Sequence, residues 1–196
     1  GALITARETL APAIERTRGV KPTYTDLLIA LVAGVLPRHP RMNASWTAEG
    51  IRLHRDVNIG VAMAVDEGTV VAVIHKADAM DLGEIALERR SLTDRARAGR
   101  LQPSDIAGAT FTITNLGMYR VDAFTAIVVP QQAGILAVGA IRNRVVPVAG
   151  DERGVGVRPM MTLTLSCDHR VVDGARGAAF LNDLVGGIED AGGVRL

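Results

Sequence analysis

Cysteine, net charge and long apolar runs are all scarce in this chain, and each scarcity excludes a class of protein. Cys167 is the single cysteine, so an internal disulfide cannot form and the usual cysteine-rich zinc sites are excluded. The 22 Lys and Arg nearly balance the 21 Asp and Glu, which leaves no broad field of one sign to hold nucleic acid. The longest apolar stretch, Leu27 to Leu36, is shorter than the roughly 20 residues that span a bilayer. We therefore expect no metal, no nucleic-acid partner and no membrane segment.

The sequence also lacks internal repeats, long linkers and low-complexity segments, and no basic-then-apolar leader opens it. Its composition, 48% hydrophobic and 22% charged, suits one folded domain over residues 1–196. The lone cysteine fits a reducing compartment, so we expect a cytoplasmic protein, or one of an organelle matrix in a eukaryote. Because the chain starts abruptly at Gly1-Ala2-Leu3-Ile4, we also expect that an N-terminal segment precedes it.

Apolar residues at helical spacing predict four helices. The predicted ranges are residues 3–14, 27–36, 82–98 and 175–188. Pro12 is expected to kink the first helix or to mark a boundary within it. Thr25-Asp26 supplies a start for the second helix, and Asp81 with Glu84 has the spacing of a capping box before the third.

Alternating apolar residues and β-branched runs predict strands between and after the helices. The predicted ranges are residues 57–65, 70–74, 110–114, 135–141, 145–148 and 161–165. Asp66-Glu67-Gly68 supplies a tight turn between the first two strands. Helices first, followed by strands with a few helices between them, favour an α+β fold: a two-layer sandwich of a mixed β-sheet covered by helices.

One histidine stands in a setting that suggests chemistry. The other three, His39, His54 and His75, are expected to be solvated. His169 instead lies between a predicted strand and a predicted helix, where folds expose reactive groups on a rigid support. A neutral imidazole, with a pKa of about 6.5, can accept a proton there, and Asp173 follows four positions later. Spacing alone also allows a plain turn in which Asp168 and Asp173 cap the backbone and His169 faces solvent.

A resemblance favours the catalytic interpretation. The segment Leu163 to Gly174, with Asp168-His169-Arg170 and Asp173-Gly174, resembles the active-site signature of the dihydrolipoamide acyltransferases, the core component of 2-oxo acid dehydrogenase complexes. Five other segments agree with this family in the same order: residues 24–28, 39–46, 56–62, 111–118 and 137–139. The resemblance covers nearly the whole chain. It implies a chloramphenicol-acetyltransferase-like fold and, in a longer chain, upstream lipoyl and subunit-binding domains.

The resemblance also implies a role for each site residue. The histidine matching His169 removes the proton from an incoming thiol, and the hydroxyl matching Thr114 stabilises the oxyanion that the attack creates. Asp173 would hold the histidine loop by an ion pair whose partner the sequence does not identify, and Asn115, Leu116 and Gly117 would contact substrate. The substrates would be coenzyme A and a lipoyl group carried on a separate domain, without a metal. Taken alone, Thr114 would be an ordinary strand threonine.

The family's assembly supplies further expectations. A homotrimer is implied, with active sites at subunit interfaces where Thr114 faces the His169 of a neighbour, and with the lipoyl domain and other complex components as partners. Trimers of this family usually form cages. The tail from Glu189 to Leu196 lacks the Pro and the run of Leu common there, so the sequence leaves cage assembly open.

Three further departures from the family pattern involve four positions. Arg120 stands where a glycine is usual, Val129 and Gln131 replace an Asn and a Pro of a common Asn-Pro-Pro loop, and Ala72 replaces a strand proline. These departures could alter contacts with substrate, and they leave His169, Thr114 and Asp173 in place.

Two other functions compete with lipoyl acyl transfer. A chloramphenicol-type O-acetyltransferase shares the fold and the histidine, and a non-catalytic scaffold core would share the fold alone. The presence of the three candidate catalytic residues argues against a scaffold. The acyl group is not fixed by the sequence; a pyruvate or branched-chain complex is expected, and Asn115-Leu116-Gly117-Met118 leans toward the pyruvate type.

Overall fold

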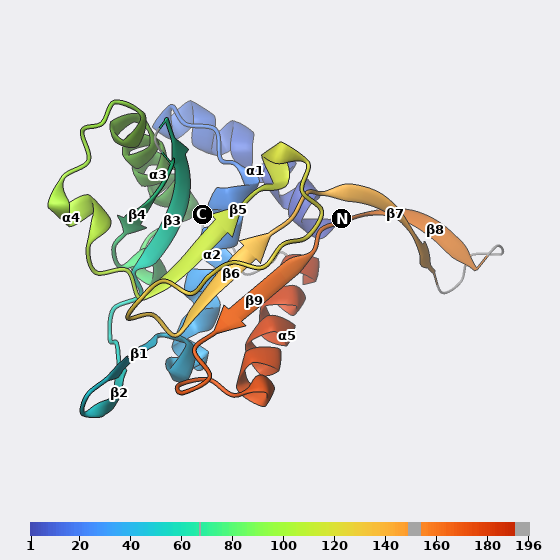
Figure 1. Ribbon diagram of the computed structural model, residues 1–196. Coiled ribbons are helices and arrows are strands. Elements are labelled where there is room, and N and C mark those ends of the chain that lie inside the picture. The colour runs from blue at the N-terminus through green and yellow to red at the C-terminus, as the bar shows by residue number, and fades with distance from the viewer. Residues whose placement is uncertain (67, 149–153, 191–196) are drawn as a thin grey trace.

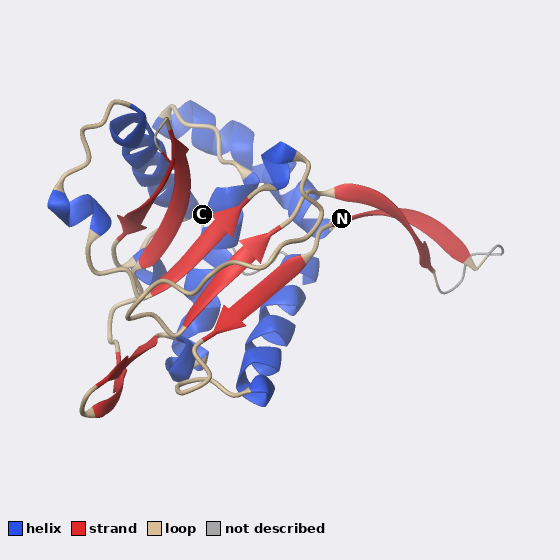
Figure 2. Cartoon of the chain, viewed as in Figure 1, coloured by secondary structure: helices blue, strands red, loops and turns tan. Residues whose placement is uncertain are grey.

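The computed structural model describes residues 1–66, 68–148 and 154–190, which form a sheet and a layer of helices (Figures 1 and 2). The sheet consists of β3 (Ile59–Val65), β4 (Gly68–Ile74), β5 (Phe111–Asn115), β6 (Gly134–Val138) and β9 (Leu163–Cys167). The helices are α1 (Ala2–Arg18), α2 (Tyr24–Val35), α3 (Leu82–Arg97) and α5 (Gly174–Asp190), and all four cover the same face of the sheet. The predicted α+β sandwich of a mixed sheet and helices is confirmed.

The strand order is β4-β3-β5-β6-β9. Strands β3, β5 and β6 run parallel, whereas β4 and β9 run antiparallel to their neighbours. The carboxyl ends of β5 and β6 therefore lie beside the amino end of β9, where Thr114 pairs with Ala137 and Ala137 pairs with Thr164. We call this side the Thr114 edge. The opposite side, where β9 ends and the chain turns through His169, is the His169 edge.

Alternation along β5 separates the two faces of the sheet. Phe111 points toward the helices, where its ring lies 5.5 Å from that of Phe180 in α5. Thr112 and Thr114 point to the other face, which we call the open face. The segment 120–132 crosses this face (Figure 2), and Gln132 accepts a 2.7 Å hydrogen bond there from the Thr112 hydroxyl.

Smaller elements surround the two layers. They are the hairpin β1 (Ala44–Thr47) to β2 (Gly50–Leu53), the hairpin β7 (Arg142–Pro147) to β8 (Val155–Met160), the short helix α4 (Pro103–Ile106), and the 3-10 turns η1 (Leu36–Arg38), η2 (Pro40–Met42), η3 (Ala77–Ala79) and η4 (Gly117–Tyr119). The β7–β8 hairpin, which we call the arm, projects away from the body of the molecule (Figure 1). The sequence did not predict β1, β2 or β8, because the first two are four residues long and β8 contains Gly156 and Pro159.

Several predicted boundaries were wrong. Pro12 lies inside α1 and is no boundary, and the helix continues to Arg18 before Gly19 ends it at φ 66°. The cap of α2 is Thr23 and not Thr25-Asp26: the Thr23 hydroxyl accepts from the Asp26 N–H, and the Asp26 carboxylate accepts from the Thr23 N–H. The capping box of Asp81 and Glu84 is confirmed.

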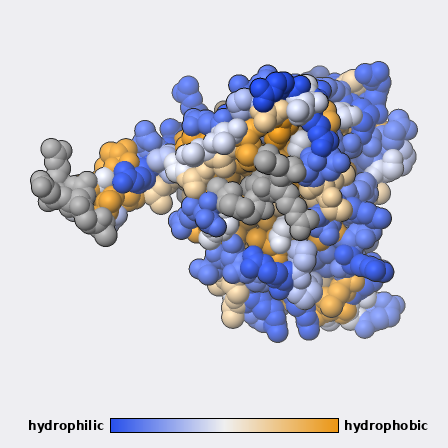
Figure 3. All heavy atoms as spheres, turned by 180° about the vertical axis from the view of Figure 1, so that it is seen from behind, coloured by the Kyte–Doolittle hydropathy of each residue, from blue (hydrophilic) through white to orange (hydrophobic). Residues whose placement is uncertain are grey.

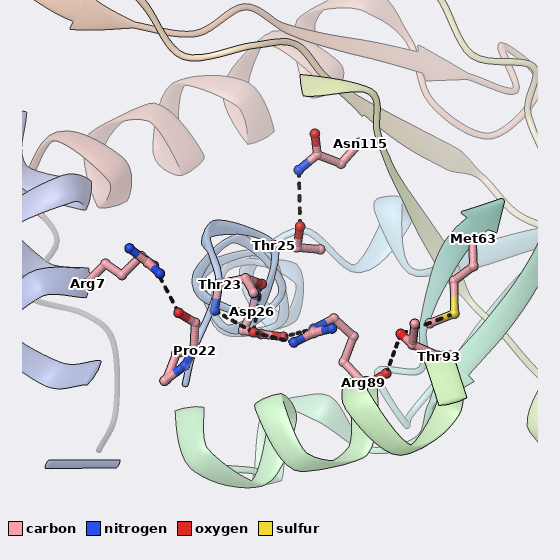
Figure 4. A network of polar contacts seen from close by, with 9 residues as sticks. All are labelled: Arg7, Pro22, Thr23, Thr25, Asp26, Met63, Arg89, Thr93 and Asn115. Atoms are coloured by element: carbon pink, nitrogen blue, oxygen red, sulfur yellow. Dashed lines mark hydrogen bonds and ion pairs between the residues drawn. The ribbon is translucent and has the colours of Figure 1, made fainter. Parts of the chain in front are cut away.

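A buried ion pair joins two of the helices. Asp26 in α2 is fully buried, and its carboxylate accepts hydrogen bonds from Arg89 in α3 at 2.5 and 3.2 Å (Figure 4). The same carboxylate accepts bonds from the backbone N–H and the hydroxyl of Thr23, at 2.7 and 2.8 Å. Every partner of the charge is therefore supplied by the fold, so loss of one partner leaves the other buried and uncompensated.

Replacing Asp26 with Ala should destabilise the fold by about 3–5 kcal/mol, because the Arg89 guanidinium would lose its counter-charge. Urea unfolding at one protein concentration measures the change. Asp94→Ala removes an exposed carboxylate from α3, the helix that carries Arg89, and should cost less than about 0.5 kcal/mol. Equal stability of the two variants would contradict the structural role assigned to Asp26.

Candidate active site

His169 lies in a turn that is fixed at both ends. The backbone N–H of Asp168 donates to the Ala133 carbonyl oxygen at 2.9 Å, and the Asp168 carbonyl oxygen accepts from the N–H groups of Val171 and Val172 at 2.9 and 3.0 Å. Both valines are buried in the core. The imidazole between these anchors is exposed in the single chain. The arrangement therefore presents a titratable ring on a rigid support.

The Asp168 carboxylate is held by Arg170. It accepts from the Arg170 backbone N–H at 3.1 Å, from Nε at 3.0 Å and from Nη2 at 2.7 Å. Hydrogen bonding from the guanidinium lowers the pKa of Asp168, so this carboxylate stays ionised at neutral pH. The guanidinium carbon also lies 5.4 Å from the ring centroid of Trp46 in β1.

Asp173 caps α5, and its ion-pair partner is Arg176. One carboxylate oxygen accepts from the Arg176 backbone N–H at 2.9 Å, and the other pairs with the Arg176 guanidinium. This backbone hydrogen bond is the main cause of the lowered pKa of Asp173. The sequence did not identify the partner, although it stands three positions further along. Asp173 thus fixes the start of the helix into which the His169 turn leads.

Thr114 and its neighbours lie at the other edge of the sheet. Thr114 is half-buried on the open face, and its hydroxyl has no hydrogen-bond partner among the described residues. The Asn115 side chain turns the other way: its amide donates to the Thr25 hydroxyl of α2 at 3.1 Å (Figure 4), and its oxygen accepts from the Gly117 N–H at 2.8 Å. Asn115 therefore ties the end of β5 to the helical layer, while Leu116 and Gly117 are half-buried beside it.

Within one chain, His169 and Thr114 do not meet. Thr114 is level with Thr164 across β6, and the three residues from Thr164 to Cys167 alone cover about 10 Å at the usual rise of a strand. His169 lies beyond the end of that strand, and the width of β6 adds two strand spacings of about 4.8 Å each. This separation far exceeds the reach of a hydrogen bond.

Two of the other histidines are not solvated, contrary to the sequence-based expectation. His39 Nε2 lies 2.9 Å from an Asp183 oxygen in α5, and its ring packs edge-on against Phe180. His54 Nε2 lies 2.6 Å from the Ser45 hydroxyl, and burial lowers the pKa of its imidazole. Their partners lie 144 and 9 positions away in sequence. His75 is exposed, as expected.

Two cavities lie near these elements. One, of about 550 Å³, is at the His169 edge and is lined by polar residues that include Ser45, His54 and Gln132. The other, of about 370 Å³, is an apolar groove between α1, α5 and β8, lined by Leu3, Leu181 and Val185 among others. Neither His169 nor Thr114 lines either cavity.

The tail residues 191–196 lie outside the described residues, so the expectation that their composition bears on cage assembly stays untested.

The departures from the family pattern have local consequences. Arg120 adopts φ 62°, a left-handed conformation that glycine adopts without strain. Gln131 has φ 66°, which a proline cannot adopt, so the loop before β6 follows a path that a proline at this position would forbid. Ala72 is fully buried in β4. Gly139, in contrast, must be glycine, because a Cβ there would collide with the Asp122 carbonyl oxygen.

Metal and membrane signals are absent from the described part of the chain. Residues 1–66, 68–148 and 154–190 contain no group of three or more His, Cys, Asp or Glu side chains that could hold a metal ion. Among the helices in these ranges, none combines the length and the apolar character that crossing a membrane requires.

Cys167 should react slowly with alkylating reagents. Burial raises the pKa of its thiol from 9.0 to about 11, so the thiolate fraction at pH 8 falls by about a hundredfold. Mass spectrometry after timed exposure to iodoacetamide measures the rate, and the urea-unfolded chain is the control. Equal rates in the folded and unfolded chain would contradict the predicted protection.

The comparisons with known proteins agree with one another. A family model described as 2-oxoacid dehydrogenases acyltransferase (catalytic domain) matches residues 1–195. The acetyltransferase component of the mitochondrial pyruvate dehydrogenase complex of Schizosaccharomyces pombe is 44% identical over 164 residues, which are 84% of this chain and 34% of that protein. The chain thus spans about a third of the length of such curated relatives.

Solved structures show the same relationship. Dihydrolipoamide acetyltransferase of Azotobacter vinelandii has a TM-score of 0.91 and 32% identity, covering 96% of this chain and 77% of that one. The study of that enzyme concerned the catalytic role of a serine, a histidine and an asparagine, the last two separated by four positions. A chloramphenicol acetyltransferase, at TM-score 0.54 and 14% identity over 89% of this chain and 80% of that one, shares the fold. The chain therefore belongs to the family of 2-oxoacid dehydrogenase acyltransferase catalytic domains.

Proposed function

We propose that this domain transfers an acyl group between the dihydrolipoyl group of a lipoyl domain and coenzyme A, as part of a 2-oxo acid dehydrogenase complex. The observation that carries the proposal is His169, an exposed imidazole on a turn anchored by Asp168 and the buried Val171 and Val172. Family membership over residues 1–195 supports the same activity. We expect the upstream lipoyl and subunit-binding domains in the longer protein.

His169 is the general base of the proposed reaction. In the direction that forms acyl-coenzyme A, its neutral imidazole removes the proton from the coenzyme A thiol, because the thiolate and not the thiol is the nucleophile. The sulfur attacks the thioester carbonyl of the acyl-lipoyl group, and the carbonyl oxygen becomes an oxyanion. When the tetrahedral intermediate collapses, the carbon–sulfur bond to the lipoyl group breaks, and the imidazolium returns the proton to the departing sulfur.

Thr114 is the proposed donor to the oxyanion. Its hydroxyl is half-buried on the open face and is not used by the described part of the chain, so it is free to donate. A single donor of this kind typically lowers the barrier by a few kcal/mol: its removal has cost about 2.7–4 kcal/mol where it has been measured. Asp173 supports the base by capping α5. The four-position spacing of the histidine and asparagine of the Azotobacter enzyme matches that of His169 and Asp173.

The site requires more than one copy of the chain. Because Thr114 and His169 lie at opposite edges of the sheet, one copy must supply the base and another the oxyanion donor, as the homotrimer implied by the family resemblance would allow. Assembly of such trimers into a cage, which the sequence left open, is not part of this proposal.

The arm is a candidate contact between copies. Among the described strands it pairs with none outside the hairpin, and a two-stranded hairpin is at best marginally stable alone. Its partnered residues Val145 and Val157 are 71% and 58% exposed and share one face. The arm, at the left in Figure 3, shows hydrophobic atoms on its surface. It starts at the Thr114 edge, where a second copy is required, so we assign its apolar face to the subunit interface.

The competing functions have weaker support. The likeness to chloramphenicol acetyltransferase, at 14% identity, extends to the fold alone, and a scaffold would not need His169, Thr114 and Asp173 together. The named relatives act in pyruvate dehydrogenase complexes, which favours an acetyl over a branched-chain acyl group. A mitochondrial location is printed for some relatives; for this chain a cytoplasmic or organelle-matrix location stays a prediction.

Replacing His169 with Ala should lower kcat by about 10²–10⁴-fold, because the thiol loses its base. The assay follows acetyl transfer from acetyl-coenzyme A to dihydrolipoamide, with isobutyryl- and succinyl-coenzyme A as competitors for specificity. His75→Ala removes an exposed histidine elsewhere and should leave kcat unchanged. Full turnover in the His169→Ala variant, with the oligomer intact, would reject His169 as the base.

Charges on the arm should break the assembly. The double variant Val145→Glu with Val157→Glu places two carboxylates in the proposed apolar contact, so sedimentation should show a shift toward monomer together with loss of turnover. Val145→Thr with Val157→Thr keeps the shape of both side chains and serves as the control. An unchanged, active oligomer in the glutamate variant would exclude the arm from the interface.

A further inference from the structure

Trp46 connects the His169 turn to a second rigid part of the molecule. It lies on β1, and its ring faces the Arg170 guanidinium, whose carbon is 5.4 Å from the ring centroid. This distance is within the range of a cation–π contact. Arg170 in turn holds the Asp168 carboxylate through Nε and Nη2. His169 lies between these two residues in the chain.

The other end of this connection is firmly anchored. Ser45, next to Trp46, is buried, and its hydroxyl donates to the Gln131 carbonyl oxygen at 2.5 Å. Asn43, one residue before β1, is also buried, and its amide donates to the carbonyl oxygens of His54 and Asp56 at 3.2 and 3.0 Å. The two residues that precede Trp46 most closely with side-chain anchors, Asn43 and Ser45, therefore hold the start of β1 in place.

Both ends of the connection rest on the same segment before β6. Gln131 holds Ser45, and Ala133, two residues later, accepts the hydrogen bond from the Asp168 N–H. Trp46, Arg170 and Asp168 thus close a loop of contacts around the His169 turn. Arg170 is the weak member of this loop, because its side chain is 62% exposed. Besides the Asp168 carboxylate, the Trp46 ring, itself 41% exposed, is the contact given for the guanidinium among the described residues.

We propose that Trp46 is a positioning residue for His169 and that it acts through Arg170. The inference rests on the proposed function, since it assumes that the direction of the His169 ring limits turnover. Asp168 and Arg170 fix the backbone on either side of the ring, and Trp46 restricts Arg170 to the conformation in which it grips Asp168. Without the Trp46 ring, the Arg170 guanidinium can leave the Asp168 carboxylate and bond to water instead. The His169 imidazole then spends less time in the orientation that removes the thiol proton.

Kinetics of Trp46 variants test the role. Trp46→Leu should lower kcat by about two- to fivefold, the factor expected from loss of an exposed cation–π contact, with the KM of both substrates unchanged. Trp46→Tyr keeps an aromatic face and should restore kcat. Leu53→Ala truncates an exposed apolar side chain on the other strand of the same hairpin and should have no effect. An unchanged kcat in Trp46→Leu, or a loss that Tyr does not restore, would overturn the proposal.

A double-variant cycle tests whether Trp46 acts through Arg170. Once Arg170→Met has removed the guanidinium, Trp46→Leu should cause no further loss of kcat. Additive losses in the double variant would show that Trp46 acts by another route and would overturn the proposal. A parallel fall in melting temperature in Trp46→Leu would count against it as well, because the effect would then be one of folding.

The fluorescence of Trp46 separates this inference from the proposed function. Trp46 is the single tryptophan of the chain, so Arg170→Met should shift its emission whether or not the protein is an acyltransferase. If wild-type protein transfers no acyl group while the emission shifts, the proposed function fails and the contact stands. If turnover depends on His169 but the emission does not respond to Arg170→Met, the positioning role of Trp46 fails and the function stands.

Discussion

The antiparallel pairing of β6 with β9 is the constraint on which the candidate site depends. Strands β5 and β6 run parallel and end together, which places Thr114 beside Ala137. The reversed strand β9 then carries the chain away from Thr114, past Cys167, to His169 at the other edge. Side-chain rotation cannot span this distance, because the strand segment alone exceeds the length of any side chain. If both residues serve one reaction, the reaction belongs to an interface between copies, and the assembly is part of the active site.

His169, the proposed base, would have to be held in place by its own chain, and the turn from Asp168 to Val172 does this with few groups. The backbone of Asp168 hydrogen-bonds to Ala133 on one side and to the buried Val171 and Val172 on the other. Its carboxylate forms an ion pair with Arg170. Movement of the turn would therefore break hydrogen bonds and expose core valines together. Asp173 continues this fixed structure into α5, because its carboxylate caps the start of that helix. Because the turn is already ordered, little conformational entropy is lost when the imidazole is oriented toward the substrate.

Local signals in the sequence predicted structure well, and distant partners could not be predicted. The capping box of Asp81 and Glu84 was found because both halves lie within one turn, and the same kind of signal, Asp173 followed by Arg176, would have supplied the missing ion-pair partner. His39 was wrongly expected to be solvated because its partner Asp183 is 144 positions away. Pro12 did not interrupt α1, since Ala11 and Ile14 beside it are buried against the core. The roles of His169 and Thr114 came from the family resemblance, because residue type and spacing alone also fit a solvated turn and an ordinary strand threonine.

The exposure of His169 in one chain is what an interfacial site requires. A ring in bulk water has little advantage over a buffer, and an oxyanion in water gains little from a single hydroxyl, because both effects depend on a site from which water is excluded. The single chain leaves His169 exposed, and no residue in the described ranges bonds to the Thr114 hydroxyl on the open face. A second copy that covers both would supply the missing walls at the same time as the missing residue. Assembly and catalysis would then be coupled through water exclusion, and an isolated subunit could bind substrate without the means to turn it over.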